Sequence, residues 1–266
     1  MKYRAGVIGC GRIGFEFDKD PKRRYIATHT GAYNYVKDID LAAVCDIDKK
    51  RLKGCMDRWN IPEGYSDLKE MLRKENLDIL SICTLPSTHY PILKEAVKYP
   101  LKAIFCEKPI AENKKNAEKM VKLCKEKNII LQIDHQRRFD PLHVDLREFI
   151  KSKEVGDVQQ VNVYYTAGVN NTGSHMFDLL SFFFGEADWV EGFFSKNISH
   201  KRNDPNIDGF MRFKSGVFAS FQACDVNKYL ILELNCFFGK GRVVLKSSGF
   251  GVDFYKVGDS KLFSGY

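Results

Sequence analysis

The chain has 266 residues, of which 44% are hydrophobic and 13% aromatic; this is enough apolar area for two ordinary cores and excludes a disordered chain. The formal net charge is +8, but the 42 basic and 34 acidic residues are mixed along the whole chain without a run of five or six like charges. We therefore expect a solvated basic surface and no nucleic-acid partner. An anionic cofactor or substrate is the best functional use of the charge.

The eight cysteines form no Cys-x-x-Cys pair and no Cys/His cluster with zinc-ligand spacing, so we expect neither a metal site nor a disulfide framework. Several of them fall in apolar segments, as free cysteines do in proteins of a reducing compartment. No signal peptide is visible before the first apolar segment, and no apolar stretch approaches the roughly 18 residues of a membrane span. These features predict a cytoplasmic protein without a membrane partner.

The first half alternates short apolar segments with amphipathic ones. The apolar segments are rich in Val, Ile and Leu and lack strict alternation, as expected for parallel strands that are buried on both faces. The predicted strands are Tyr3–Gly9, Leu41–Asp46, Leu77–Thr84, Ala103–Cys106 and Ile129–Ile133. The predicted helices are Lys49–Trp59, Asp67–Lys74, His89–Lys98 and Lys114–Lys127. This alternation predicts an α/β fold, a Rossmann-type doubly wound parallel sheet, over residues 1–133.

A glycine-rich loop directly follows the first predicted strand. The segment Gly9-Cys10-Gly11-Arg12-Ile13-Gly14 fits the pattern G-x-G-x-x-G. In such a loop the first glycine permits a tight turn, the second lets the backbone approach a pyrophosphate, and the third allows a helix to pack closely on the strand. The start of the following helix offers N–H groups to the phosphates. We therefore predict that this loop binds a dinucleotide cofactor.

The second predicted strand ends at Asp46. An acidic residue there can accept hydrogen bonds from both hydroxyls of the adenosine ribose and repels a 2′-phosphate, which favours NAD over NADP. NADP stays possible because Lys49, Lys50 and Arg51 follow closely and could receive a phosphate. The alternative role of Asp46, or of Asp48, is to cap the next helix.

The segment Asp18–Thr30 makes the distance from the glycine loop to Asp46 longer than is usual for such a domain. Its Pro21 and its basic triplet predict a solvated surface loop, and the alternative is a lid over the sugar or phosphate end of a substrate. His29 is predicted to be a loop histidine.

The pattern changes near Asp134, where longer strand-like segments begin. The predicted strands are Val158–Ala167, Trp189–Asn197, Gly209–Phe213, Val217–Cys224, Leu230–Phe238 and Arg242–Lys246, and the predicted helices are Leu142–Ser152 and Ser174–Phe184. Glycine turns separate several of these strands, so residues 134–266 predict an α+β domain with a largely antiparallel sheet and helices on one face.

Three of these strands carry clustered aromatic residues, at Phe193-Phe194, Phe218–Phe221 and Phe237-Phe238. Such residues either pack in the core or form a face for self-association, and the second use would make the protein a homodimer or homotetramer.

Three further motifs accompany the glycine loop in order along the chain. They are Cys83-Thr84-Leu85-Pro86-Ser87-Thr88-His89, Cys106-Glu107-Lys108-Pro109 and Gly173-Ser174-His175-Met176-Phe177-Asp178. Together with the glycine loop they resemble the glucose–fructose oxidoreductase/inositol dehydrogenase family (Gfo/Idh/MocA), and the likeness runs from the first strand to about residue 246. The resemblance implies a nicotinamide dinucleotide cofactor and a sugar-type small-molecule substrate.

The resemblance also implies roles for single residues. Besides the glycine loop and Asp46, the cofactor would be contacted by Thr84, Leu85, Pro86, His89, Glu107, Lys108 and Gln136. The substrate would be contacted by Lys108, Arg138, Asn171, His175 and Asp178, with Arg137 near the domain junction. Lys108 and His175 would be catalytic, and relatives often have a cis peptide bond between this lysine and the following proline.

Elementary chemistry supports these two catalytic roles. A histidine titrates near neutrality and can accept the proton that leaves an alcohol as hydride leaves its carbon. A lysine ammonium beside the oxygen stabilises developing alkoxide character. Asp178 follows His175 by three residues, so both lie on one face of the predicted helix, where Asp178 could bind a substrate hydroxyl.

Structural alternatives exist for each of these residues. His175 could cap its helix or lie in the core, Lys108 could be a surface lysine at a strand end, and His89 could be an ordinary first-turn residue. Arg137 and Arg138 could form surface ion pairs. Two further histidines, His135 and His143, are expected to be structural or exposed.

The sequence departs from the family pattern in two ways. Many relatives have an aspartate four residues before the histidine, where this chain has Asn171, which carries no charge. Relatives also usually continue through another strand and a helix, whereas this sequence stops at Tyr266, so we expect a compact or shortened second domain.

The leading functional hypothesis is an NAD(P)-dependent oxidoreductase that transfers hydride between nicotinamide and a hydroxyl or keto carbon of a sugar, an inositol or a sugar nucleotide. One alternative is a redox-neutral hydrolase or lyase that uses tightly held NAD. Another is a dinucleotide-binding sensor or subunit without catalytic activity, which Asn171 and the short C-terminus favour.

Overall fold

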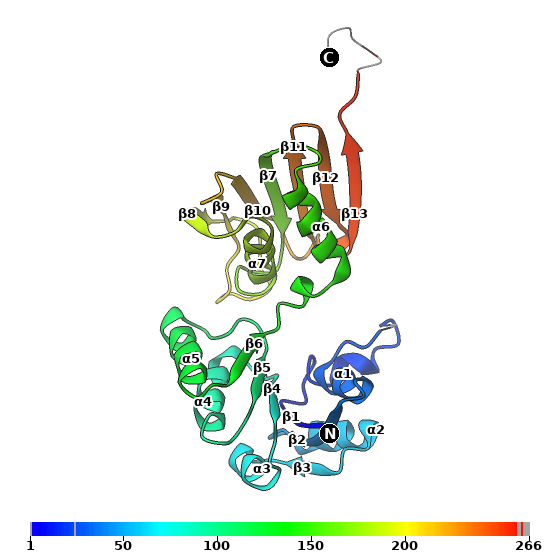
Figure 1. The fold of residues 1–266 in the computed structure, drawn as a ribbon, viewed down its shortest axis with the longest axis vertical. Coiled ribbons are helices and arrows are strands. Elements are labelled where there is room, and N and C mark those ends of the chain that lie inside the picture. The colour runs from blue at the N-terminus through cyan, green and yellow to red at the C-terminus, as the bar shows by residue number, and fades with distance from the viewer. Residues whose placement is uncertain (1, 24, 260–261, 263–266) are drawn as a thin grey trace. The chain divides into compact units, whose positions relative to one another are not determined.

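The computed structural model describes residues 2–23, 25–259 and 262. Its contacts divide the chain into two units, Met1–Asp134 and His135–Tyr266. Each unit is built around one sheet of its own (Figure 1).

The first unit contains six strands in the order β3-β2-β1-β4-β5-β6. The strands are β1 (Tyr3–Ile8), β2 (Ile39–Cys45), β3 (Glu63–Tyr65), β4 (Ile79–Ile82), β5 (Ala103–Cys106) and β6 (Ile130–Ile133). Every neighbouring pair is parallel. The order runs outward in both directions from β1 and β4, which confirms the predicted doubly wound sheet.

Helices cover both faces of this sheet (Figure 1). They are α1 (His29–Tyr35), α2 (Lys49–Trp59), α3 (Leu68–Lys74), α4 (Pro86–Ala96) and α5 (Lys114–Glu126), with a 3₁₀ turn, η1, at Glu16–Lys19. Side chains of α1 and α2 form one core with Ala5 and Val7 of β1, and those of α3, α4 and α5 form another with Ile8. The burial of both strand faces explains the continuous apolar segments in the sequence.

Capping residues define where several of these helices begin. Asp48, Asp67 and Asn113 accept hydrogen bonds from first-turn N–H groups of α2, α3 and α5, and Pro86 occupies the first turn of α4. From the sequence either Asp46 or Asp48 could cap α2, and the structure shows that Asp48 does.

Two elements of the first unit were not predicted. β3 has three residues, too few for a periodic pattern, and the buried residues of α1 are mostly polar rather than apolar, namely His29, Thr30, Gly31 and Tyr33. The prediction of a solvated loop over Asp18–Thr30 was wrong at its end, because Thr28, His29 and Thr30 are buried and His29 begins α1. Among the described residues of that segment, 19–22, 25 and 26 in its middle are exposed.

The second unit contains seven strands in the order β13-β12-β11-β7-β10-β9-β8. The strands are β7 (Val158–Tyr165), β8 (Ala187–Phe194), β9 (Ile207–Phe213), β10 (Phe218–Ala223), β11 (Leu232–Phe238), β12 (Gly241–Lys246) and β13 (Gly251–Lys256). All neighbouring pairs are antiparallel except β7 and β10, which confirms the predicted largely antiparallel sheet. The edge strand β13 was not predicted, because its side chains are half-buried or exposed and give no apolar segment.

Two helices, α6 (Pro141–Ser152) and α7 (Thr172–Phe184), pack on one face of this sheet (Figure 1). Leu146 of α6 and Leu180 of α7 share a core with inward-facing strand residues such as Val163 and Phe221. A short 3₁₀ turn, η2 (Gln136–Arg138), precedes α6, and another, η3 (Ser247–Gly249), precedes β13.

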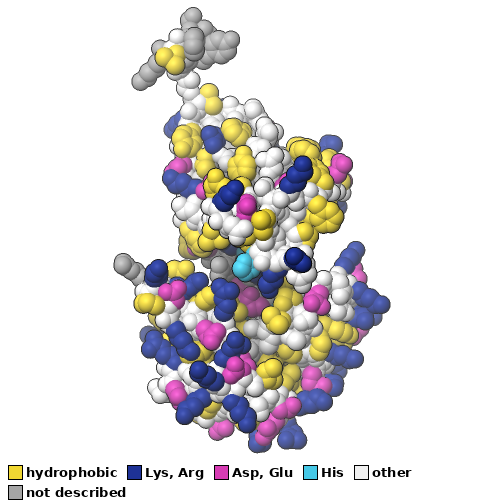
Figure 2. Space-filling model, turned by 180° about the vertical axis from the view of Figure 1, so that it is seen from behind, with side chains coloured by type: hydrophobic (Ala, Val, Ile, Leu, Met, Phe, Trp, Pro, Cys, Tyr) yellow, Lys and Arg dark blue, Asp and Glu magenta, His cyan; other side chains and the backbone are white. Residues whose placement is uncertain are grey.

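The opposite face of the seven-stranded sheet carries exposed aromatic side chains. They are Tyr164, Trp189, Phe193, Phe210, Phe218, Phe237 and Tyr255. Phe218 stacks on Phe210 with ring centroids 5.7 Å apart and meets Trp189 edge-on at 5.9 Å. In Figure 2 hydrophobic side chains gather over the second unit, whereas on the first unit Lys and Arg are scattered among acidic residues.

Strand alternation divides the aromatic clusters that the sequence analysis identified. Phe221 and Phe238 are buried in the core, while Phe218 and Phe237 lie on the open face. The core-packing use is therefore confirmed for Phe221 and Phe238, while self-association through Phe218 and Phe237 stays a prediction.

Among the described residues, none of the helices combines the length and the apolar character that crossing a bilayer requires.

Candidate functional site

The glycine loop after β1 has the geometry that a phosphate-binding turn requires. Gly9 has φ +96°, and a Cβ there would lie 2.7 Å from the carbonyl oxygen of Cys83, so only glycine fits. A Cβ on Gly14 would lie 1.9 Å from the carbonyl oxygen of Gly9. A Cβ on Gly11, by contrast, would meet no atom within 4 Å. The space beside Gly11 is therefore available to a ligand, while the other two glycines are needed for close packing.

Asp46 connects the end of β2 to this loop. Its buried carboxylate accepts hydrogen bonds from the backbone N–H of Cys10 at 2.7 Å and from that of Asp48 at 2.8 Å. The backbone N–H groups of Phe15 and Glu16 close the next turn on the carbonyl of Gly11. These turns lead into the four-residue 3₁₀ turn η1, so the prediction of a helix that begins directly after the loop was wrong; the first α-helix, α1, starts only at His29.

The start of α1 is bonded to the other end of the glycine loop. The N–H of His29 donates to the carbonyl of Ile13 at 3.1 Å, and the hydroxyl of Thr30 donates to the carbonyl of Gly14 at 2.8 Å. Thr28 caps α1 and also contacts the Asp18 carboxylate. The segment that lengthens the first crossover is thus tied to the loop at its end.

The turn after β4 contains Thr84, Leu85 and Pro86 and leads into α4. Leu85 is 68% exposed. His89 is fully buried, and its ring nitrogens lie 3.1 Å from the Thr84 carbonyl and 3.2 Å from the Pro109 carbonyl. His89 therefore holds the turn against the segment after β5. This packing role agrees with the alternative in which His89 is an ordinary residue of the first helical turn.

Glu107 and Lys108 follow β5 at the carboxyl edge of the sheet. The Glu107 side chain is buried; Oε1 lies 3.1 Å from Nε2 of His29, and Oε2 accepts the Lys108 backbone N–H at 3.2 Å. The Lys108–Pro109 peptide is cis, as the resemblance implied, and Lys108 is half-buried rather than an exposed surface lysine.

A buried polar network that the sequence analysis missed lies behind Glu107. It contains His29 and Tyr33 of α1, Ser81 of β4, and Asp134 after β6. His29 Nδ1 lies 3.0 Å from the Ser81 hydroxyl, which in turn lies 2.7 Å from the Tyr33 hydroxyl. The one available signal was Ser81, a polar residue inside an otherwise apolar strand segment.

The second unit brings together four of its charged or polar side chains around α7. Arg138 Nε donates to Asp178 Oδ1 at 2.8 Å, and Asp178 Oδ2 lies 3.7 Å from Nδ1 of His135. The His135 ring meets the His175 ring edge-on, with centroids 6.4 Å apart. His135, predicted to be structural or exposed, is half-buried and lies near both the Asp178 carboxylate and the His175 ring.

His175 is the fourth residue of α7 and is half-buried, so it neither caps the helix nor lies in the core. The N-cap position belongs to Asn171, which is exposed. Two hydrogen bonds hold the backbone of Asn171. Its N–H donates to the Asp204 carboxylate at 3.1 Å, and its carbonyl accepts a hydrogen bond from the Ser174 hydroxyl at 2.7 Å.

The two arginines of η2 behave differently. Gln136 and Arg138 are accessible, but Arg137 is buried, stacks on the Phe250 ring and donates to the Ser248 carbonyl at 3.1 Å. Burial lowers the pKa of its guanidinium, and Asp140 and Asp178 oppose that shift only partly. Arg137 is thus a packing residue of the second unit rather than a member of a surface ion pair.

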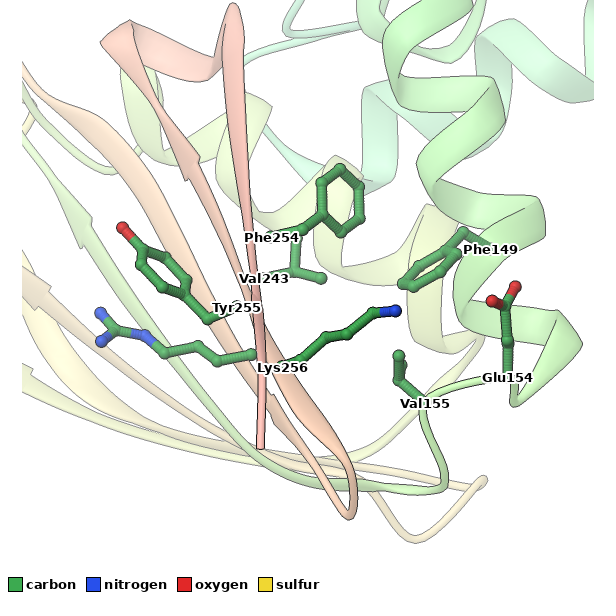
Figure 3. A pocket seen from close by; sticks show the side chains of 8 residues that line it. Phe149, Glu154, Val155, Val243, Phe254, Tyr255 and Lys256 are labelled. Carbon is green, nitrogen blue, oxygen red and sulfur yellow. The ribbon is translucent and has the colours of Figure 1, made fainter. Parts of the chain in front are cut away.

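A cavity of about 220 Å³ in the second unit lies beside α6, β12 and β13 (Figure 3). It is lined by Phe149, Glu154, Val155, Arg242, Val243, Phe254, Tyr255 and Lys256. Phe149 and Phe254 meet edge-on across it, with ring centroids 5.1 Å apart. None of the predicted site residues lines this cavity.

Comparison with known proteins identifies the family. Residues 3–135 match the model described as "Oxidoreductase family, NAD-binding Rossmann fold", and residues 167–243 match the "GFO/IDH/MocA C-terminal domain". The chain belongs to the GFO/IDH/MocA oxidoreductase family. The first unit is accordingly an NAD-binding Rossmann domain, which agrees with the open space at Gly11 and the acidic end of β2.

Curated relatives have modest identity to this chain. Myo-inositol 2-dehydrogenase of Thermotoga maritima is 28% identical over 153 residues, which are 58% of this chain and 42% of that protein. D-apiose dehydrogenase of Paraburkholderia graminis is 24% identical over 258 residues, 88% of this chain and 65% of that protein. The match spans less than half the length of the inositol dehydrogenase relatives.

Solved structures share the fold of the whole chain. The WlbA dehydrogenase of Bordetella pertussis, crystallised with NADH and UDP-GlcNAcA, has a TM-score of 0.81 at 20% identity, covering 98% of this chain and 84% of that one. The scyllo-inositol dehydrogenase of Lactobacillus casei, crystallised with NAD(H) and scyllo-inositol, has a TM-score of 0.73 at 16% identity, covering 92% and 76%.

Proposed function

We propose that this protein is an NAD-dependent oxidoreductase that acts on a hydroxyl or keto carbon of a sugar, an inositol or a sugar nucleotide. The observation that carries the proposal is the glycine loop, in which Gly9 and Gly14 are sterically required while Gly11 faces free space. A pyrophosphate that approaches the backbone closely would fit beside Gly11, in space that a side chain there would fill. Bound there, the nicotinamide cofactor would supply the acceptor or donor of hydride.

The position of Asp46 supports NAD as the preferred form of the cofactor. The N–H groups of Cys10 and Asp48 hold its carboxylate in place. The N-cap of α2 is Asp48, so Asp46 is not needed for capping. A fixed carboxylate at this strand end accepts ribose hydroxyls and repels a 2′-phosphate. NADP remains the weaker candidate, through the basic residues at the start of α2.

Lys108 and His175 would be the catalytic residues, one for charge stabilisation and the other for proton transfer. The Lys108 ammonium would stabilise negative charge developing on the substrate oxygen, and the His175 imidazole would accept or return the proton of that oxygen. Lys108 is held by the short turn around Glu107, and His175 by the first turns of α7. Asn171 has no charge, so in this chain His175 would act without a carboxylate at that position.

The substrate would be held by polar groups of the second unit. Asp178 accepts from Arg138 and lies near His135, an arrangement suited to the hydroxyl groups of a polyol. Relatives named inositol 2-dehydrogenase and D-apiose dehydrogenase, and a fold neighbour crystallised with a sugar nucleotide, make the sugar class the first to test.

Self-association through the open face of the second sheet is part of the proposal. Seven aromatic residues are exposed on this face, and three of them, Trp189, Phe210 and Phe218, are joined by ring contacts under 6 Å, as at surfaces that pair with a partner. The partner would be a second copy of the chain, because symmetric dimers are the commonest assemblies. A cytoplasmic location would agree with the eight cysteines, all of which are free thiols.

The test is binding and turnover with NAD and with NADP against sugars, inositols and sugar nucleotides, followed by absorbance of the reduced nicotinamide. One substrate class should produce reduced cofactor. The variants Lys108→Ala and His175→Ala should bind NAD but lose turnover, about 10²–10⁴-fold for the proton-transfer residue.

Matched controls are Lys115→Ala on the exposed side of α5 and His200→Ala in an exposed loop, which should leave turnover unchanged. Turnover that is equally lost in the controls would mean that the effect is not specific to the site. NAD binding without reduced cofactor for any substrate would contradict the oxidoreductase proposal, and the absence of binding would contradict the cofactor site.

A further inference from the structure

His29 is bonded to two parts of the first unit that are far apart in the sequence. Its backbone N–H donates to the carbonyl of Ile13 in the glycine loop, at 3.1 Å. Its ring Nε2 lies 3.1 Å from Oε1 of Glu107, whose Oε2 accepts the backbone N–H of Lys108 at 3.2 Å. A single residue therefore connects the loop proposed to bind pyrophosphate with the segment that carries the proposed catalytic lysine.

The His29 ring is buried on every side. It is 5% exposed as a residue, and it packs against the Phe105 ring with centroids 4.7 Å apart. The titratable and polar groups around it are Glu107 and Asp134 at Nε2, Ser81 at Nδ1, Tyr33 beyond Ser81, and the Cys83 thiol. Tyr33 comes from α1 and Ser81 from β4, while Cys83, Glu107 and Asp134 directly follow β4, β5 and β6.

The arrangement at Nε2 favours a positive charge on the His29 ring. Two carboxylates approach this one nitrogen, at 3.1 Å for Glu107 and 3.6 Å for Asp134. Burying two carboxylates side by side is costly unless a cation compensates them. The Ser81 hydroxyl can accept a hydrogen bond from Nδ1–H, because its own hydrogen can be donated to the Tyr33 hydroxyl. Both ring nitrogens can thus carry hydrogen.

We propose that His29 is a positioning residue that stays protonated at neutral pH and, as an imidazolium, holds Glu107 so that the Glu107-Lys108-Pro109 segment keeps its place relative to the glycine loop. The effect on catalysis rests on the proposed function; the charge state and the link itself do not. His29 would act through Glu107 and Lys108 and would not touch the substrate.

The pKa of His29 supports this assignment. Burial alone would lower it, but the Cys83 thiol, Asp134 and Glu107 together outweigh burial and hold the pKa well above the usual value. Because the folded pKa is raised, the stabilisation by His29 is fully present below the unfolded pKa of about 6.5. It is lost as pH rises through the folded value. The stability difference between wild type and a His29 variant should therefore shrink at alkaline pH.

The first experiment is ¹⁵N NMR of the histidine side chains in the full chain, with His29→Gln to assign the His29 signals. At pH 8, where a histidine with the ordinary pKa is neutral, His29 should show two protonated ring nitrogens. A neutral His29 tautomer at pH 8 overturns the proposal. A shift of the signals on removal of divalent metal by a chelator also overturns it, because it would mean that His29, Glu107 and Asp134 hold a metal instead.

The second experiment compares His29→Gln with His29→Phe in NAD binding and turnover. Gln can still donate to Glu107 but carries no charge, and Phe keeps the ring without either nitrogen. NAD affinity should weaken in both, more in His29→Phe, and kcat should fall by up to about 100-fold, the scale expected when a reacting group is displaced by about 1 Å. His200→Gln is the control and should change neither.

These outcomes separate the inference from the proposed function. If wild type binds NAD but turns over no substrate, the NMR signals and the NAD affinities of the His29 variants still test the link. Wild-type NAD affinity and kcat in His29→Phe, with its fold retained by circular dichroism, would overturn the positioning role.

Discussion

The carboxylate of Asp46 accepts a 2.7 Å hydrogen bond from the backbone N–H of Cys10, so the end of β2 and the middle of the glycine loop are held by the same side chain. Asp46 thereby has two possible effects on a dinucleotide. It can contact the ribose directly, and it keeps the loop in place for the pyrophosphate. Both effects depend on its charge, because a charged acceptor forms the stronger hydrogen bond.

Replacing Asp46 by Asn should weaken NAD binding about tenfold, since a charge-assisted hydrogen bond is worth roughly 1 kcal/mol more than a neutral one. NADP binding should weaken less, because the charge that repels a 2′-phosphate is removed. Isothermal titration with both cofactors measures the ratio. Asp48→Asn is the control, since Asn caps a helix as well as Asp and should leave both affinities unchanged. An unchanged NADP-to-NAD ratio in Asp46→Asn would show that Asp46 does not select the cofactor.

The three glycines of the loop should respond differently to alanine. Gly11→Ala should leave thermal stability within about 0.5 kcal/mol, because its Cβ meets nothing, but should weaken NAD binding roughly tenfold to a hundredfold by filling the space beside the loop. Gly14→Ala should destabilise the first unit by about 3 kcal/mol or more, because the backbone oxygen 1.9 Å away cannot give way like a side chain. Urea unfolding and NAD titration check both. Normal NAD affinity in Gly11→Ala would place the pyrophosphate elsewhere.

The ion pair between Arg138 and Asp178 should contribute to the stability of the second unit. Arg138→Met keeps the side-chain stem but removes the 2.8 Å charged hydrogen bond, and should cost about 1–2 kcal/mol after allowance for the partial exposure of Arg138. Arg147→Met is a matched control, because Arg147 lies over the same Phe182 ring as Arg138 but reaches only the exposed Glu148. A larger loss in Arg147→Met, measured by urea unfolding, would assign the stabilisation to ring stacking instead.

The open face of the second sheet should lose self-association when charge is placed at its centre. Phe218 contacts both Phe210 and Trp189, so Phe218→Glu should raise the dissociation constant of a dimer at least about tenfold, as expected for a central interface residue. Light scattering over a concentration series measures this change. Tyr35→Glu, at the exposed end of α1 in the first unit, is the control. A wild-type protein that stays monomeric at all concentrations would remove this part of the proposal.

The position of Lys108 illustrates what could be predicted from local pattern. It follows an apolar strand segment and precedes a proline, and both features are visible in the sequence. The His29 network illustrates what could not be predicted from local pattern. Its members come from α1, β4 and the ends of β5 and β6, and no local period connects a histidine near residue 30 with carboxylates more than 70 residues later.

Short-range periodicity and turn chemistry in the sequence by themselves determined the doubly wound sheet, the glycine loop and the largely antiparallel second sheet, because these depend on the spacing of apolar residues and glycines along the chain. Only the tertiary structure decided that Asp48 rather than Asp46 caps α2, that His29 is buried against Glu107, and that Phe218 and Phe221 lie on opposite faces of one sheet. The physical reason is that burial, ion pairing and hydrogen-bond partners depend on which segments the fold brings together in space, and the residues along one segment do not record that.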